Sequence, residues 1–121
     1  MKRDMDLMRQ VLLKVEELPF DGRFYDIAVE GHTQDEITYH VMLLHEAGFV
    51  EAIDLSNLGG IHWQPKRLTY SGHEFLDAAR SERVWQKAKA WTLNSTGTLT
   101  IEGLKLALPH VIKALIQAGG F

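Results

Sequence analysis

The side chains best suited to chemistry in this 121-residue sequence are six histidines and a series of acidic residues. Glu36 and His40 are four residues apart, as are His73 and Asp77, so each pair can share one face of a helix. Each pair offers two ligands, whereas a catalytic zinc site normally takes three from the protein, and the HExxH pattern is absent. The sequence therefore predicts no metal site and no cofactor.

The sequence also lacks the patterns of common covalent and phosphate-binding sites. No serine stands in a GxSxG turn, there is no glycine-rich phosphate loop, and cysteine is absent. Gly59 and Gly60 fit a hairpin turn instead. No pair of carboxylates lies in an apolar setting that would tune one as an acid and the other as a base. We therefore expect a binding module and not an enzyme.

Length and composition indicate an ordinary globular domain. The chain has 13 Lys and Arg against 16 Asp and Glu, a net charge of −3, and is 45% hydrophobic. A single domain over residues 1–121 can bury a core without a metal or a disulfide. No apolar run approaches the roughly 18 residues of a membrane span, and the amino terminus is acidic where a signal peptide would be apolar. We expect a cytoplasmic protein that does not contact the membrane.

Hydrophobic spacing predicts a largely helical chain with one β-hairpin. Thr33 and Glu36 form a capping-box pattern that begins a helix, and Pro65 makes the second hairpin strand an edge strand because proline cannot donate to a sheet. The expected helices cover about residues 4–18, 33–48, 69–80, 81–91 and 98–118, and the expected strands 24–30, 49–55 and 61–68.

Three expectations concern the carboxy-terminal third. The residues from Asn94 to Gly97 have loop chemistry, and Pro109 should kink the last helix or split it after Leu108. The last helix carries a nearly continuous apolar stripe, which either closes the core or is available to a partner. The stripe consists of Ile101, Leu104, Leu108, Val111, Ile112 and Leu115.

The order of these elements resembles a winged helix, in which a helix-turn-helix is backed by a β-hairpin wing. Residues 37–50 resemble the recognition-helix region of bacterial winged-helix regulators, and residues 67–76 resemble their Leu-Thr-x-x-Gly segment after the wing. One departure is that residues 24–33 leave almost no room for a second helix, so the helix pair is expected to be reduced to one.

Three separated blocks carry a closer resemblance. Residues 1–7, 39–48 and 68–78, together with Val84 and Trp85, resemble the bacterial and phage family called domain of unknown function 2513. This resemblance implies a mainly helical α+β fold with a winged helix-turn-helix at 1–91 and extra C-terminal helices. The resemblance to winged-helix proteins, in which a trailing helix often mediates dimers, implies a homodimer formed through the helix at 98–118. The family brings no established activity.

Charge leaves two functions open. Residues 24–65 contain no Lys or Arg and seven carboxylates, which argues against reading of duplex DNA by the helix at 33–48. The leading hypothesis is a DNA-associated transcriptional regulator that contacts double-stranded DNA through its backbone, although these basic side chains could equally be solvated. The candidate contacts are Lys66, Arg67, Arg80, Arg83, Lys87 and Lys89.

The alternative hypothesis is a protein-interaction module whose acidic segment at 26–54 binds a basic protein partner. Its candidate contacts are Asp35, Tyr39, His40 and Glu46. His40 can be understood either as an exposed contact or as a partly buried histidine bonded to the wing, and we favour the second because an acidic helix makes contact with a DNA groove costly.

Overall fold

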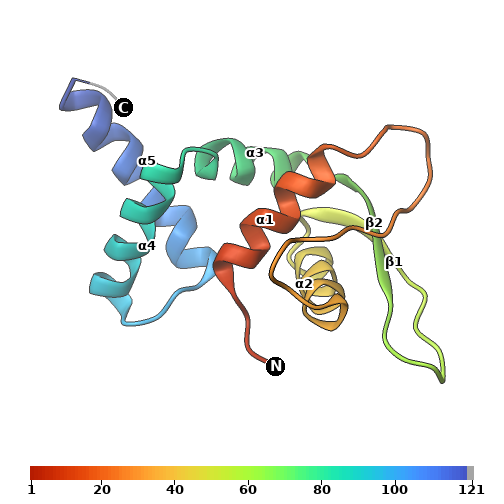
Figure 1. The fold of residues 1–121 in the computed structure, drawn as a ribbon. Helices are drawn as coiled ribbons and strands as arrows, with labels where there is room; N and C mark the ends of the chain where they lie inside the picture. The colour runs from red at the N-terminus through yellow and green to blue at the C-terminus, as the bar shows by residue number, and fades with distance from the viewer. Residues whose placement is uncertain (120–121) are drawn as a thin grey trace. The chain divides into compact units, whose positions relative to one another are not determined.

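The computed structural model describes residues 1–119. It contains α1 (Met5–Glu16), α2 (Gln34–Glu46), β1 (Val50–Asp54), β2 (Trp63–Leu68), α3 (Tyr70–Ala79), α4 (Glu82–Thr96) and α5 (Ile101–Gln117) (Figure 1). The predicted mainly helical α+β class is confirmed. The chain divides into two compact units, Met1–Glu74 and Phe75–Phe121, called here the N-terminal and C-terminal units. None of the helices in residues 1–119 is both long enough and apolar enough to span a bilayer.

Side-chain caps set the helix starts in the N-terminal unit. Asp4 accepts the amide of Leu7 at the start of α1. The predicted capping box begins α2, because Thr33 accepts the amide of Glu36 while the Glu36 carboxylate accepts the amide of Thr33. α1 packs against α2 and β2, and α2 packs against both strands. These contacts bury the apolar side of each helix.

The hairpin forms as predicted, with β1 antiparallel to β2. Its register shifts between Glu51 and Ala52, where the partners change from Arg67 to Pro65. Such a shift is a β-bulge, and it places Pro65 where no ladder amide is needed. The Pro65 carbonyl accepts the amide of Tyr25 at 3.0 Å.

The predicted strand at 24–30 is wrong. These residues are extended and bury Ile27 and Val29 as the alternation predicted, but they do not join the sheet. Pro65 and the bulge interrupt β2, so the strand edge offers no regular run of partners for a third strand. Residues 17–49 contain one helix, α2, as the short stretch at 24–33 predicted.

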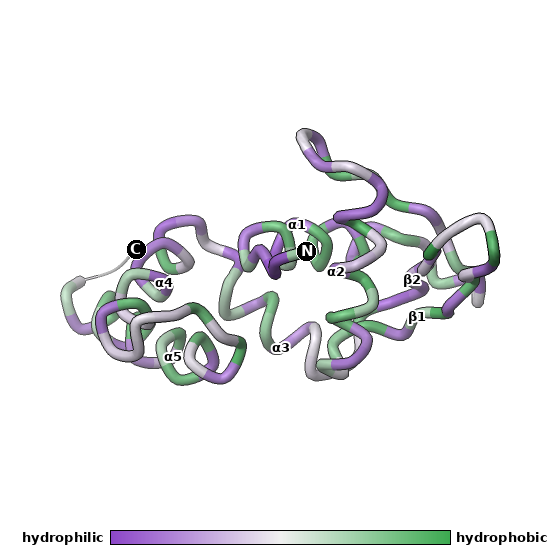
Figure 2. The backbone as a smooth tube through the Cα atoms, turned by 90° about the horizontal axis from the view of Figure 1, so that it is seen from below, coloured by the Kyte–Doolittle hydropathy of each residue, from purple (hydrophilic) through white to green (hydrophobic). Residues whose placement is uncertain are grey.

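In the C-terminal unit, α4 packs against α5, and Trp85, Leu104 and Leu108 of these helices are buried. Hydrophobic and hydrophilic stretches alternate along both helices, as expected when each buries one face (Figure 2). The predicted loop at 94–97 is wrong, because α4 runs to Thr96 and ends at Gly97 with a φ of 78°. The Thr96 hydroxyl lies 3.0 Å from the Thr92 carbonyl in the last turn and 2.9 Å from the Thr98 carbonyl beyond Gly97, so this side chain bonds both sides of the helix end.

The predicted split of the last helix does not occur. α5 is continuous from Ile101 to Gln117 with Pro109 inside it. Pro109 lies on the exposed side, so its missing amide costs one backbone bond while the apolar stripe stays buried on both sides of it.

Candidate functional site

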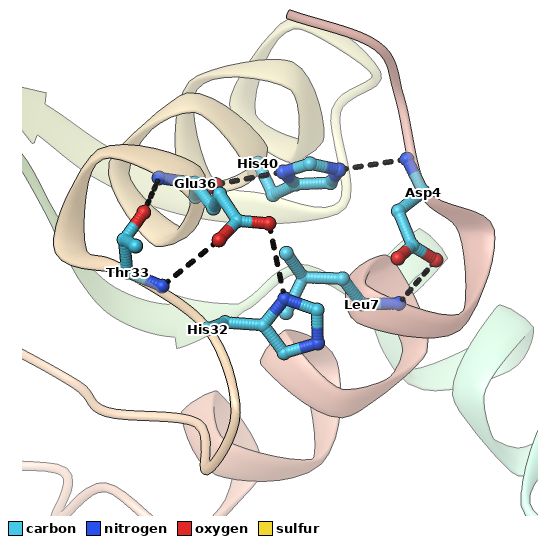
Figure 3. A network of polar contacts seen from close by, with 6 residues as sticks. All are labelled: Asp4, Leu7, His32, Thr33, Glu36 and His40. Carbon is cyan, nitrogen blue, oxygen red and sulfur yellow. Dashed lines mark hydrogen bonds and ion pairs between the residues drawn. The ribbon is translucent and has the colours of Figure 1, made fainter.

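A buried histidine holds α2 against the start of α1 (Figure 3). His40 is 1% exposed, its Nε2 accepts the amide of Asp4 at 2.8 Å, and its Nδ1 lies 2.7 Å from the carbonyl of Glu36. An amide can only donate and a carbonyl can only accept, so both contacts require the neutral ring with its proton on Nδ1. His40 therefore joins two helices that lie far apart in the sequence.

This geometry corrects two expectations for the histidines. His40 bonds the amino-terminal segment and not the wing, and it lies beneath the surface of α2, so its side chain cannot meet a partner. The Glu36 carboxylate bonds His32 at 3.3 Å and the Thr33 amide, and not the His40 ring. Within residues 1–119, no three His, Asp or Glu side chains gather at a metal site.

The hairpin is fixed to the other side of α2. The Thr38 hydroxyl accepts the amide of Trp63 at 2.5 Å, and the ring of Trp63 lies 5.2 Å from that of His45. The loop between the strands then leaves an open groove of about 410 Å³ beside α2. The groove is lined by Met1, Asp35, Thr38, Tyr39, Met42, Gly59, Gly60 and Ile61.

The exposed side of α2 carries two carboxylates and two large side chains in one row. Asp35, Tyr39, Met42 and Glu46 follow one another at spacings of four, three and four residues, which places them on one helix face. Asp35 and Glu46 are exposed, and Tyr39 and Met42 are partly exposed. We call these four residues the α2 outer face. Sequence reasoning missed Met42, although its spacing matches.

Apolar side chains are also exposed on the hairpin loop. Ile61 is 63% exposed, and Leu58 is fully exposed in the turn closed by the bridge between Asn57 and Gly60. The loop projects away from the helices of its unit (Figure 1). Isolated exposed apolar residues are ordinary, but Ile61 lines the same groove as Asp35, Tyr39 and Met42 of the α2 outer face.

The two basic candidates on β2 share one carboxylate. Arg67 Nε lies 2.7 Å and Lys66 Nζ 3.4 Å from the carboxylate oxygens of Glu51, on the facing strand. Lys66 Nζ also lies 5.3 Å from the centre of the Phe24 ring. Each cation has a partner within the hairpin, which reduces the positive charge that the hairpin offers to a phosphate.

The four other basic candidates belong to the C-terminal unit. Arg80 bonds Asp77 at 2.8 Å, and Lys89 Nζ lies 5.9 Å from the centre of the Trp85 ring. Arg83 and Lys87 are exposed and four residues apart on α4. By count, the N-terminal unit has 7 basic and 13 acidic residues, a net charge of −6, and the C-terminal unit has 6 and 3, a net charge of +3. The two units therefore differ in sign.

Several carboxylates of the N-terminal unit are held in the charged form. Arg67, and to a smaller extent Lys66, lowers the pKa of Glu51. Hydrogen bonds from His62 and Gln64 lower the pKa of Asp26. Hydrogen bonds from the Thr33 amide and then from His32 lower the pKa of Glu36. The Ser56 hydroxyl and amide lower the pKa of Asp54. The acidic character of this unit therefore persists into mildly acid solution.

These shifts predict acid destabilisation of the hairpin. Lowered pKa values in the folded state mean that the unfolded state binds more protons, so the contribution of Glu51 is complete above its ordinary pKa of 4.5 and is lost as the pH falls through the lowered value. We expect Glu51→Gln to destabilise the chain modestly at neutral pH and to match the parent once the pH falls below the lowered pKa of Glu51. Urea unfolding at each pH measures the difference, and a constant difference at every pH contradicts this account.

Gly72 is a structural residue that the sequence analysis noted only as part of a motif. A Cβ at this position would lie 2.0 Å from the carbonyl oxygen of Phe49. The same turn is held by Thr69, whose hydroxyl donates to the Gly48 carbonyl at 2.6 Å and whose amide donates to the Phe49 carbonyl at 3.0 Å. The Leu-Thr-x-x-Gly segment thus joins the end of β2 and the start of α3 to the end of α2.

Comparison with known proteins places the chain among uncharacterised sequences. An uncharacterised protein of Haemophilus influenzae is 32% identical over 117 residues, which cover 96% of this chain and 99% of that protein. No solved structure matches. Residues 2–99 match the model of a family described as "Hypothetical protein (DUF2513)". The match covers most of the chain and includes the blocks that carried the resemblance from residue 2 onward, so this protein belongs to the DUF2513 family.

Proposed function

We propose that this protein is a non-enzymatic interaction module that binds a basic protein partner through the α2 outer face. The charge of that face carries the proposal. Asp35 and Glu46 lie at its two ends, and residues 24–65 hold no Lys or Arg to offset them. Duplex DNA, which carries one phosphate charge per about 1.7 Å, would be repelled by this surface, whereas a basic protein would be attracted.

We further infer that the N-terminal unit is a reduced winged helix. α2 precedes the hairpin, as a recognition helix does, and the Leu68 to Gly72 segment follows the second strand. In this interpretation the residues of α2 that would face a DNA groove are Asp35, Tyr39, Met42 and Glu46. They include no Arg or Lys, the commonest partners of guanine, and no Asn or Gln for adenine.

A second candidate function, a DNA-associated regulator, is favoured by one observation. Arg83 and Lys87 are exposed on one side of α4 in the unit with a net charge of +3. Contacts of these cations to the DNA backbone give affinity without sequence preference.

We also propose a homodimer formed through α5, in keeping with the exposed Leu106 and Ile116 on that helix.

The test is a titration of the isotope-labelled full chain with a Lys-rich helical peptide, followed by NMR. We expect shifts in α2 and in the loop at 59–61, and at least tenfold weaker binding in the double variant Asp35→Lys with Glu46→Lys. Arg83→Glu, a charge reversal at an exposed site of the C-terminal unit, is the control and should bind at least as well as the parent. An acidic peptide of equal length should not bind.

Binding of duplex DNA is measured in parallel, with a labelled duplex of random sequence at about 50 and 200 mM salt. Duplex binding that collapses at the higher salt and is lost in Arg83→Glu would support the regulator and count against the docking proposal. An affinity for the Lys-rich peptide that is unchanged by charge reversal at Asp35 and Glu46 would also overturn the docking proposal.

A further inference from the structure

We infer that the partner presents a basic amphipathic helix, with two apolar side chains between two cations, to the groove beside α2. This inference rests on the proposed function and adds the chemistry of the partner. It combines the charges of the α2 outer face with the apolar groove next to it. The geometry of α2 sets the spacing that the partner must match.

The charges define the length of the contact. Asp35 and Glu46 are eleven residues apart, which corresponds to about 16 Å along a helix axis at 1.5 Å per residue. A partner helix that lies along α2 meets both carboxylates when its own cations are also eleven residues apart. Both carboxylates are exposed, so long Lys or Arg side chains can reach them while keeping partial contact with water.

Apolar side chains fill the space between the charges. Tyr39 and Met42 stand four and seven residues after Asp35, and Ile61 and Met1 line the same groove. Ile61 is 63% exposed, so a partner would cover apolar surface that now faces water. A volume of about 410 Å³ falls within the range of ordinary binding pockets.

A helix matches this pattern better than an unordered basic tail. Apolar residues four and seven positions after a first cation, with a second cation at position eleven, lie on one helix face. The spacing of four, three and four is the same in both directions, so a parallel and an antiparallel helix fit equally. An unordered basic tail would pair its cations with the two carboxylates and leave the groove uncovered.

Three synthetic peptides of equal charge test the inference against the full chain. The first peptide has two Lys residues eleven positions apart, with Leu four and seven positions after the first Lys. The second carries the same two Leu on the opposite helix face. The third has Ala in place of both Leu. We expect the first to bind about tenfold more tightly than either other peptide and to become helical on binding. Calorimetry and circular dichroism measure both effects.

Ile61→Ser provides the protein-side variant, because its side chain is exposed and its loss should not disturb folding. It should weaken the first peptide about tenfold and leave the Ala peptide unchanged. Glu17→Ser, an exposed change away from the groove, is the control and should alter neither.

The two proposals fail in different ways. If all three peptides bind alike and all weaken in the double variant of Asp35 and Glu46, the docking function stands and the amphipathic helix is overturned. If no basic peptide binds, or if binding ignores those two carboxylates, the docking function fails and the inference fails with it.

Discussion

Gly72→Ala should lower the free energy of unfolding by about 3 kcal/mol or more, although alanine is the better helix former by about 1 kcal/mol. The added Cβ would lie 2.0 Å from the Phe49 carbonyl oxygen and 2.9 Å from its carbon. Both atoms belong to the backbone, so no side chain can move aside. Relief requires the turn between α2 and β1 to shift, which breaks the bond from the Thr69 amide to the Phe49 carbonyl.

Urea unfolding followed by far-UV circular dichroism measures this effect. Ser71→Ala is the matched control, because Ser71 is the exposed neighbour in the same helix and should change stability by less than about 0.5 kcal/mol. A Gly72→Ala protein as stable as the parent would show that α3 does not contact Phe49 this closely.

The second large effect is expected at His40. His40→Ala should cost about 3 kcal/mol, because it leaves a cavity in the core and removes the acceptor of the Asp4 amide. The contact joins segments 36 residues apart. We therefore expect the start of α1 to loosen from α2, with faster hydrogen exchange at the Asp4 and Leu7 amides.

His40→Gln separates the hydrogen bond from the volume. A glutamine oxygen can accept the Asp4 amide, so this variant should recover part of the stability and part of the exchange protection. The double variant Asp35→Lys with Glu46→Lys changes only the exposed side of α2 and should leave Asp4 protected. Equal exchange at Asp4 in the parent and in His40→Ala would contradict the assigned contact.

Local chemistry made much of the fold predictable. The capping box of Thr33 and Glu36, the helix start at Asp4, and the hairpin each depend on residues a few positions apart. The restriction of these patterns to neighbouring residues also explains the errors. The loop predicted at 94–97 failed because α4 continues to Thr96 and ends at Gly97 in the left-handed conformation, a choice that composition does not reveal.

The candidate site was predictable in its charge but not in its geometry. Residue counting along 24–65 was enough to expect an acidic surface, and helical spacing was enough to put Asp35, Tyr39 and Glu46 on one face of α2. The groove depends on where the hairpin loop lies, which Thr38 and Trp63 decide across 25 residues. Periodicity carries no information about such distances.

The sequence by itself determined the helices, the hairpin, the acidic segment and the family, because caps, turns and charge runs act over a few neighbouring residues. Only the tertiary structure decided that residues 24–30 stay outside the sheet, that His40 is buried against Asp4, and that Lys66 and Arg67 share Glu51. Each of these outcomes depends on whether two segments at least 15 residues apart in the chain make contact. The free energy of such contacts is set by packing, and no local pattern encodes it.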